Sequence, residues 1–239
     1  MRITVVGSGH GVPEPHRKCT CFMVEIGEKI YFVDMGTPGI DALVDRNLKP
    51  ENVEAIFITH KHGDHADGLL SFMDLISWYY KTANPEIHLP DMKMVDAING
   101  WLDVTMASFK REVTYKKIEA GEIFNDGVLK VTAIATKHCP DSHAFLFEAN
   151  GKRVLFSGDL KKPEIDFPYV DGPIDLLFCE AAHFYPIEYL PVFEKLDLKK
   201  VSVNHYSDTF LPSALELKKA LAEKGLPVIL ATDDMVFTV

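Results

Sequence analysis

The feature that most constrains this chain is a group of four metal-binding side chains within six residues. The segment from His60 to His65 has the sequence His-Lys-His-Gly-Asp-His and directly follows an apolar run, Ala55 to Thr59. A short apolar run of this kind is typical of a buried strand, so we expect the polar side chains on the loop that leaves it. Imidazole binds zinc, iron and nickel, and a carboxylate also accepts a harder cation. The spacing therefore predicts a site for two metal ions.

Three later strand ends supply the rest of a coordination shell. His138, Asp159 and His205 each follow a predicted strand. The complete set of candidate metal ligands is His60, His62, Asp64, His65, His138, Asp159 and His205. Solvated loop histidines are the alternative, but polar groups gathered beneath strand ends would cost stability if they had no partner. Seven ligands are enough for two metal ions and an open position.

Length and charge exclude several other classes of protein. The 239 residues are 47% hydrophobic and 25% charged, as in globular proteins with a sizeable core. With 35 acidic and 25 basic residues the net charge is −10, which opposes unguided binding to nucleic acid or anionic membranes. The N-terminal sequence lacks the apolar core of a secretion signal, and no stretch approaches the roughly 18 apolar residues of a membrane span. We therefore expect a cytoplasmic protein whose four cysteines form no disulfide scaffold.

The order of predicted elements indicates more than one sheet. Strand patterns dominate residues 3–33 and 129–156, whereas apolar residues recur at helical spacing over 69–80 and 92–107. Strands interleaved with helices in both halves predict two packed sheets with helices outside. We expect them to form a single domain over residues 1–239.

Local signals predict the starts of two helices. Thr37 precedes Pro38 and is expected to cap a short helix that has the proline at its first position. A later helix is predicted over 212–224, where Ser213 and Glu216 have the spacing of a capping box.

The chain resembles the metallo-beta-lactamase superfamily through nearly its whole length. The segment from His60 to His65 is similar to the superfamily signature, and the three later ligands follow in the right order. The resemblance implies an α+β fold, a four-layered αββα sandwich with the site at one edge of the sheets. It also implies that His60, His62 and His138 hold one metal ion, that Asp64, His65 and His205 hold the other, and that Asp159 bridges them.

Residues outside the ligand set indicate the branch of the superfamily. The opening loop from Gly7 to Pro13, followed by Arg17 and by Asp34-Met35-Gly36, resembles the ribonuclease Z and cyclic-phosphodiesterase branch. Beta-lactamases of the best-known zinc class have a cysteine at the position of Asp159 and lack the histidine that matches His65. The resemblance therefore argues against antibiotic hydrolysis.

Two departures separate the chain from ribonuclease Z itself. Ribonuclease Z has a tRNA-clamping arm between the residues that match His138 and Asp159, whereas here Asp159 follows His138 by only 21 positions, enough for one hairpin. We therefore do not expect a tRNA substrate. The branch also has a His-Glu-Ala-Thr motif whose histidine assists proton transfer, and this chain has Cys-Glu-Ala-Ala, in which only Glu180 matches. His183 is either its replacement or an ordinary surface histidine.

The predicted function is a dinuclear metal-dependent hydrolase, first of all a phosphodiesterase for a small or cyclic nucleotide-like diester. Two divalent cations, zinc by default and manganese or iron otherwise, would lower the pKa of a shared water from 15.7 toward about 7. The resulting metal-bound hydroxide would attack the diester. Asp64, His183 and Glu180 are the candidate catalytic residues, and Asp34 is the candidate for orienting a ligand histidine.

Other functions would use the same metal ligands and stay open at this point. Hydrolysis of lactones, thioesters or sulfate esters needs the same hydroxide, and a metal-binding sensor or accessory protein needs the ligands without turnover. We expect a small-molecule substrate and no membrane partner, with a homodimer left open. The segments from about Asp67 to Pro90 and from Lys161 to Pro173 are predicted surface loops that contact the substrate.

Overall fold

Two seven-stranded sheets pack face to face in a computed structural model that describes residues 1–12 and 14–239. Pro13, in the opening loop, lies outside the described residues. The first sheet has the order β14 (Val236–Thr238), β1 (Arg2–Gly7), β2 (Cys21–Ile26), β3 (Lys29–Met35), β4 (Val53–Phe57), β5 (Glu86–Leu89) and β6 (Tyr115–Lys117). The second sheet has the order β13 (Val228–Leu230), β12 (Val201–Tyr206), β11 (Leu176–Ala181), β10 (Lys152–Phe156), β9 (His143–Ala149), β8 (Lys130–Ala135) and β7 (Gly121–Asn125).

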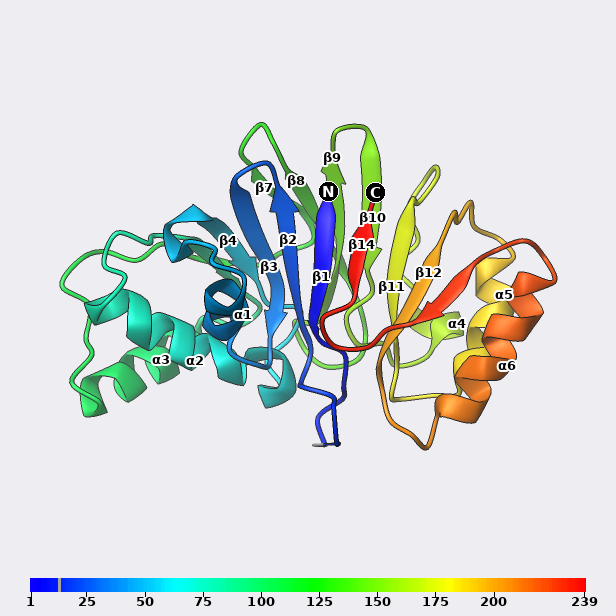
Figure 1. Cartoon of the computed structure of the whole chain (residues 1–239), viewed down its shortest axis with the longest axis horizontal. Coiled ribbons are helices and arrows are strands. Elements are labelled where there is room, and N and C mark those ends of the chain that lie inside the picture. The colour runs from blue at the N-terminus through cyan, green and yellow to red at the C-terminus, as the bar shows by residue number, and fades with distance from the viewer. Residues whose placement is uncertain (13) are drawn as a thin grey trace.

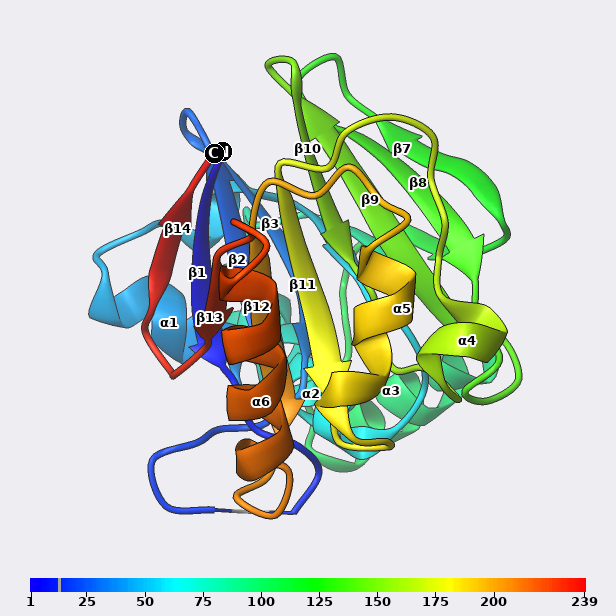
Figure 2. The same cartoon turned by 90° about the vertical axis from the view of Figure 1, so that its right-hand side faces the viewer.

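Helices cover the outer face of each sheet. The first sheet carries α1 (Gly39–Asp45), α2 (Gly63–Trp78) and α3 (Lys93–Val104), and the second carries α4 (Pro163–Asp166), α5 (Leu190–Phe193) and α6 (Leu211–Ala222). Short 3₁₀ turns, Pro50–Asn52 and Pro186–Tyr189, precede β4 and α5. Figure 1 shows the two groups of helices on opposite sides of the paired sheets, and Figure 2 shows α5 and α6 in front of the second sheet. The α+β, four-layered αββα sandwich predicted from the resemblance is confirmed.

Side chains that alternate along each strand explain why both faces of a sheet are covered. In β3, Tyr31 and Val33 lie between the two sheets, whereas Ile30 and Phe32 pack against the helices on the outer face. Because successive side chains of a strand point to opposite faces, each strand contributes to two apolar layers. Burying one such side chain stabilises the fold by about 1.5–3 kcal/mol.

Strand direction decides where the polar loops meet. In the second sheet β10, β11 and β12 are parallel. β8 is antiparallel to β9, and β9 is antiparallel to β10, so β8 has the same direction as β10. The C-terminal ends of β8, β10 and β12 therefore share one edge of the sheet, which is the edge where ligands gather in sheets of this kind.

The two predicted helix caps are wrong, because neither side chain caps its helix, although α6 begins at Leu211, next to the predicted start at 212. Pro38 is the N-cap of α1 and no side chain bonds to the free backbone N–H groups there, so Thr37 is not the cap. α6 begins before Ser213, whose hydroxyl instead accepts a hydrogen bond of 3.1 Å from the backbone N–H of Ile187. The predicted loop from about Asp67 to Pro90 is also wrong over most of its length, which belongs to α2 and β5.

Asp126 ties the two sheets together at the turn between β7 and β8. Lys29 Nζ and Tyr31 Oη each donate to its Oδ2 at 2.7 Å, and the backbone N–H of Leu129 donates to Oδ1 at 2.8 Å. Burial alone would raise the pKa of Asp126, but the hydrogen bonds from these groups lower it to about 2. The ionised carboxylate is therefore the form that the folded protein favours.

We expect Asp126→Asn to lower the free energy of unfolding by about 1.5–3 kcal/mol at pH 7, because hydrogen bonds to a charged acceptor are lost. The pKa of Asp126 is about 2 in the folded protein against an ordinary 3.8. The contribution is therefore complete above that ordinary value and is lost as the pH falls toward 2. Urea denaturation at pH 7 and pH 3 measures it, with the exposed Asp171→Asn as the control. A difference from wild type that is equally large at both pH values would contradict the prediction.

Candidate metal centre

All seven predicted metal ligands come together at one edge of the paired sheets. The loop after β4 and the first turn of α2 contribute His60, His62, Asp64 and His65, and the second sheet contributes His138 after β8, Asp159 after β10 and His205 at the end of β12. Gly36 allows α2 to begin this close to β3, because a Cβ at that position would lie 1.7 Å from the carbonyl oxygen of Asp64.

Four of these residues form a first donor set, His60, His62, His138 and Asp159, whose atoms lie within 4.8 Å of one another. The Nδ1 atom of His62 lies 3.0 Å from His60 Nε2 and 3.2 Å from His138 Nε2. Asp159 Oδ2 lies 3.6 Å from each of those Nε2 atoms. Ligand atoms at 2.0–2.1 Å from a tetrahedral zinc ion are about 3.3 Å apart, so the spacing fits one metal ion.

Asp64, His65 and His205 form a second donor set. The Nε2 atoms of His65 and His205 each lie 3.7 Å from Asp64 Oδ2. Asp159 also reaches this set, because its Oδ1 lies 3.4 Å from His65 Nε2 and its Oδ2 lies 3.4 Å from His205 Nε2. One carboxylate therefore stands between the two sets.

Two buried atoms of the site lack an ordinary partner. Among the residues that the structure describes, His65 Nε2 and Asp159 Oδ1 are buried and form no hydrogen bond. Leaving a buried polar atom unpaired costs about 1–3 kcal/mol. A cation held between these atoms would remove that cost, and nitrogen and carboxylate donors are the ligands that zinc, manganese and iron accept. The cluster fits a metal site.

Asp34 orients two histidines, one from each donor set. Its carboxylate accepts hydrogen bonds from His65 Nδ1 at 2.8 Å and from the backbone N–H and hydroxyl of Thr59 at 2.7 and 2.9 Å. The Thr59 hydroxyl in turn lies 3.0 Å from His60 Nδ1. Because the Nδ1 atoms of both rings are engaged, their Nε2 atoms face the site. Burial alone would lower the pKa of His65, but Asp159 and Asp34 raise it well above its usual value in the metal-free chain.

His205 is oriented by a residue that the sequence did not single out. The backbone of His205 has a positive φ of 51°, and its Nδ1 lies 2.6 Å from the hydroxyl of Thr20. That hydroxyl donates to the carbonyl oxygen of Gly9, so His205 Nδ1–H is the donor to Thr20 and Nε2 is left for the site. A threonine on a strand gives no sequence signal for this role, because threonine is common in strands.

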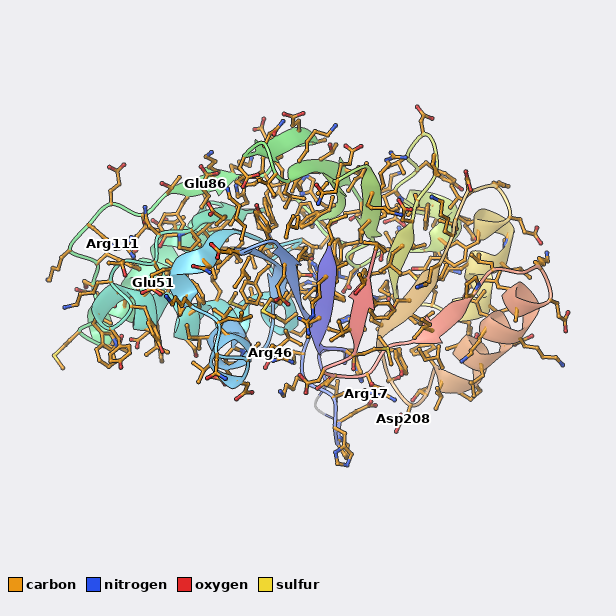
Figure 3. All side chains as sticks on the ribbon, turned by 45° about the horizontal axis from the view of Figure 1, so that its top comes forward. Arg17, Arg46, Glu51, Glu86, Arg111 and Asp208 are labelled. Carbon is orange, nitrogen blue, oxygen red and sulfur yellow. The ribbon has the colours of Figure 1, made fainter. Side chains whose placement is uncertain are left out.

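Arg17, between the opening loop and β2, holds its segment against the chain that follows His205. Its guanidinium donates to the carbonyl oxygen of Tyr206 at 2.9 Å and to Asp208 at 2.9 Å, and it lies over the ring of Tyr206. Figure 3 labels Arg17 and Asp208, which lie next to each other. Arg17, which helped to indicate the branch of the superfamily, thus supports the end of β12, where the proposed ligand His205 lies.

His183 and Glu180 form a pair beside the two donor sets. His183 Nδ1 lies 3.0 Å from Glu180 Oε1 and 3.7 Å from Asp159 Oδ2. The side chain of His183 is 35% exposed, whereas Glu180 is buried and also accepts the backbone N–H groups of Leu160 and Ala182. Burial by itself lowers the pKa of His183, but the hydrogen bond and charge of Glu180 raise it to about 9. This histidine lies at the site and is not an isolated surface residue.

We expect Asp34→Asn to weaken metal binding about 10- to 100-fold, as removal of an outer hydrogen-bond partner typically does. Asparagine has the shape of aspartate and tolerates the positive φ of 56° at this position, but its amide is a poorer acceptor for His65 Nδ1–H. Competition with a chromophoric chelator measures the affinity, and the exposed Asp45→Asn is the control. Wild-type affinity in the Asp34 variant would contradict the prediction.

The family described as anti-Pycsar protein Apyc1 matches residues 1–222. The chain belongs to this family. Ribonuclease Z of Bacillus subtilis is 26% identical over 181 residues, which are 73% of this chain and 56% of that protein, so the chain spans about half the length of such curated relatives. These matches confirm the metallo-beta-lactamase superfamily and its ribonuclease Z and phosphodiesterase branch.

Solved structures share the fold. The crystal structure of the short form of human tRNase Z matches with a TM-score of 0.76 at 21% identity, covering 100% of this chain and 99% of that one. A diphosphatase from the PhnP family matches with a TM-score of 0.64 at 19% identity, covering 100% and 97%. Within the described ranges, no helix is both long and apolar enough to cross a membrane.

Proposed function

We propose that the chain is a dinuclear metal-dependent hydrolase, and that its substrate is a small or cyclic nucleotide-like phosphodiester. The single observation that supports this most is the position of Asp159 between two donor sets, 3.6 Å from His60 of the first and 3.4 Å from His205 of the second. Two cations that share a carboxylate form the clamp with which many enzymes stabilise the attacking and leaving oxygens of a phosphate ester.

The proposed coordination follows the two donor sets. His60, His62 and His138 would hold one ion, Asp64, His65 and His205 the other, and Asp159 both. Zinc is the first choice for this mixture of imidazole and carboxylate, with manganese or iron as alternatives. When bound, the metal ions supply a water acidic enough to act as nucleophile at neutral pH and neutralise charge on the phosphate oxygens.

Three residues of the chain have proposed catalytic roles. Asp64, whose side chain is 18% exposed, would orient the attacking water on the open side of the second donor set. His183 would donate a proton from Nε2 to the leaving alkoxide as its bond to phosphorus breaks. Glu180 accepts from His183 Nδ1 at 3.0 Å and so would hold the ring in the orientation and protonation state that this transfer needs.

A small substrate agrees with the chain between His138 and Asp159. That segment is a single hairpin, β9 and β10, whose strands pair directly from Lys152 opposite Ala149 to Phe156 opposite Phe145. It leaves no residues for a separate clamping arm, so we propose that tRNA is not the substrate. The names of the relatives, a ribonuclease and a diphosphatase, both denote cleavage of a phosphorus–oxygen bond. The four cysteines are free, which favours the cytoplasm as the compartment.

The test is an activity panel on protein whose metal content has been measured after purification without added metal. Cyclic and linear nucleotide diesters, a lactone, a thioester and a sulfate ester are compared. We expect diester hydrolysis that Asp64→Ala abolishes and that Asp96→Ala, a first-turn aspartate of α3, leaves intact. If the protein cleaved the lactone, the thioester or the sulfate ester but no diester, the proposed phosphodiesterase activity would be overturned. Bound metal without any turnover would indicate a sensor or accessory protein.

A further inference from the structure

The segment after Asp159 contains a buried carboxylate with an unusual set of partners. Lys161 to Pro173 was expected to be a surface loop, but it includes the short helix α4, and Asp166 at its end is only 8% exposed. The carboxylate accepts backbone N–H groups from Lys137 at 2.7 Å, from Lys161 at 3.0 and 3.1 Å, and from Lys162 at 3.1 Å.

These backbone groups belong to two different loops of the metal centre. Lys137 directly precedes His138, and Lys161 lies two residues after Asp159. A single oxygen, Asp166 Oδ2, accepts from both loops. Hydrogen bonds to an ionised carboxylate are shorter and about twice as strong as neutral ones, so Asp166 fixes the two loops against each other.

The distance that these loops control is the distance between two proposed ligands of one metal ion. His138 Nε2 lies 3.6 Å from Asp159 Oδ2. Metal–ligand distances are fixed to about 0.2 Å, so a shift of either loop by even a fraction of an ångström weakens binding. A second contact between the loops, from the hydroxyl of Thr136 to the carbonyl oxygen of Asp159, is long at 3.4 Å and is a weaker brace.

We propose that Asp166 is a positioning residue for the metal centre, which sets the spacing between His138 and Asp159 without touching metal or substrate. This inference rests on the metal ligation in the proposed function, but it does not depend on which ester the protein cleaves. It gives the Lys161–Pro173 segment a role in holding the metal ligands.

Asp175 offers a matched control within the same chain. It is also 8% exposed, and it also accepts a backbone N–H, that of Arg153 at 2.9 Å, together with the Nζ atom of Lys199 at 2.8 Å. Arg153 lies near the start of β10, whereas Asp159 follows the end of that strand. Asp166 and Asp175 thus both accept backbone hydrogen bonds, at opposite ends of β10.

The experiment compares Asp166→Asn and Asp175→Asn with wild type in metal-free protein. Urea denaturation gives the stability of each variant, and competition with a chromophoric chelator gives its zinc affinity. We expect both variants to lose stability, but only Asp166→Asn to lose zinc affinity, by about 10- to 100-fold. Unchanged affinity in Asp166→Asn, or an equal loss in Asp175→Asn, would overturn the proposal.

Two further readouts keep the result decisive. Cobalt absorption spectra report ligand geometry, and we expect Asp166→Asn to change them whereas Asp175→Asn does not. If Asp166→Asn fails to fold, Asp166→Glu, which keeps the charge on a longer side chain, takes its place, and a wild-type cobalt spectrum in that variant counts against the proposal. If the wild-type protein bound zinc but cleaved no diester, the proposed phosphodiesterase activity would be refuted. The comparison of zinc affinity between Asp166→Asn and Asp175→Asn would still test the role of Asp166.

Discussion

Asp159→Ala should reduce phosphodiester turnover by about 1,000-fold or more, which corresponds to about 4 kcal/mol of lost transition-state stabilisation. Its carboxylate is 3.4–3.6 Å from histidine nitrogens of both donor sets, so the substitution removes a ligand from each proposed metal ion at once. The histidines that remain would also lose the buried negative charge that offsets the two cations.

Metal analysis and steady-state kinetics measure this effect together. We expect the variant to retain less than the wild-type metal content after dialysis, and added metal to restore activity only in part. The exposed Asp171→Ala is the control. A variant that kept both metal ions and its turnover would show that Asp159 does not bridge them.

His183→Ala should lower kcat about 100- to 10,000-fold, the usual contribution of a positioned proton donor, while metal content stays at the wild-type level. The loss should depend on the leaving group. A nucleotide diester releases a basic alkoxide that needs a proton, whereas p-nitrophenolate leaves without one. We therefore expect the variant to lose much less activity toward a p-nitrophenyl diester.

Kinetics on both substrates separate proton donation from other roles of His183. His16→Ala is the control, because His16 is an exposed histidine outside both donor sets. An equal loss on the two substrates would mean that His183 positions the substrate or a metal ligand instead of donating the proton.

The proposed ligands could be predicted from the sequence because they lie at the end of a strand or within a few residues after it. An apolar run that ends in a histidine or aspartate identifies a strand end, and parallel strands bring such ends together. The predicted helix caps at Thr37 and Ser213 were wrong. Local patterns assume that a side chain bonds to its own helix, whereas the Ser213 hydroxyl meets Ile187 from another segment.

Asp34 could be singled out as a supporting residue from the sequence, but Asp166 and Thr20 could not, for the same physical cause. Asp166 contacts a backbone group 29 positions away, and Thr20 contacts a histidine 185 positions away. Neither spacing follows a helical or strand period, so only the folded chain brings the partners together. His183 could be predicted only in part. The sequence shows that it lies three residues after Glu180, but not that its ring comes close to Asp159.

The origin of the ligands also makes the metal centre a cross-link between the two halves of the chain. Each donor set combines residues that precede α3 with residues that follow β7. Bound metal would therefore clamp the two sheets together, and binding to the folded chain alone stabilises it by about 4 kcal/mol per site when metal exceeds its Kd 1,000-fold. We expect chelation to lower the melting temperature as well as the activity, so that loss of metal exposes the protein to heat and proteolysis.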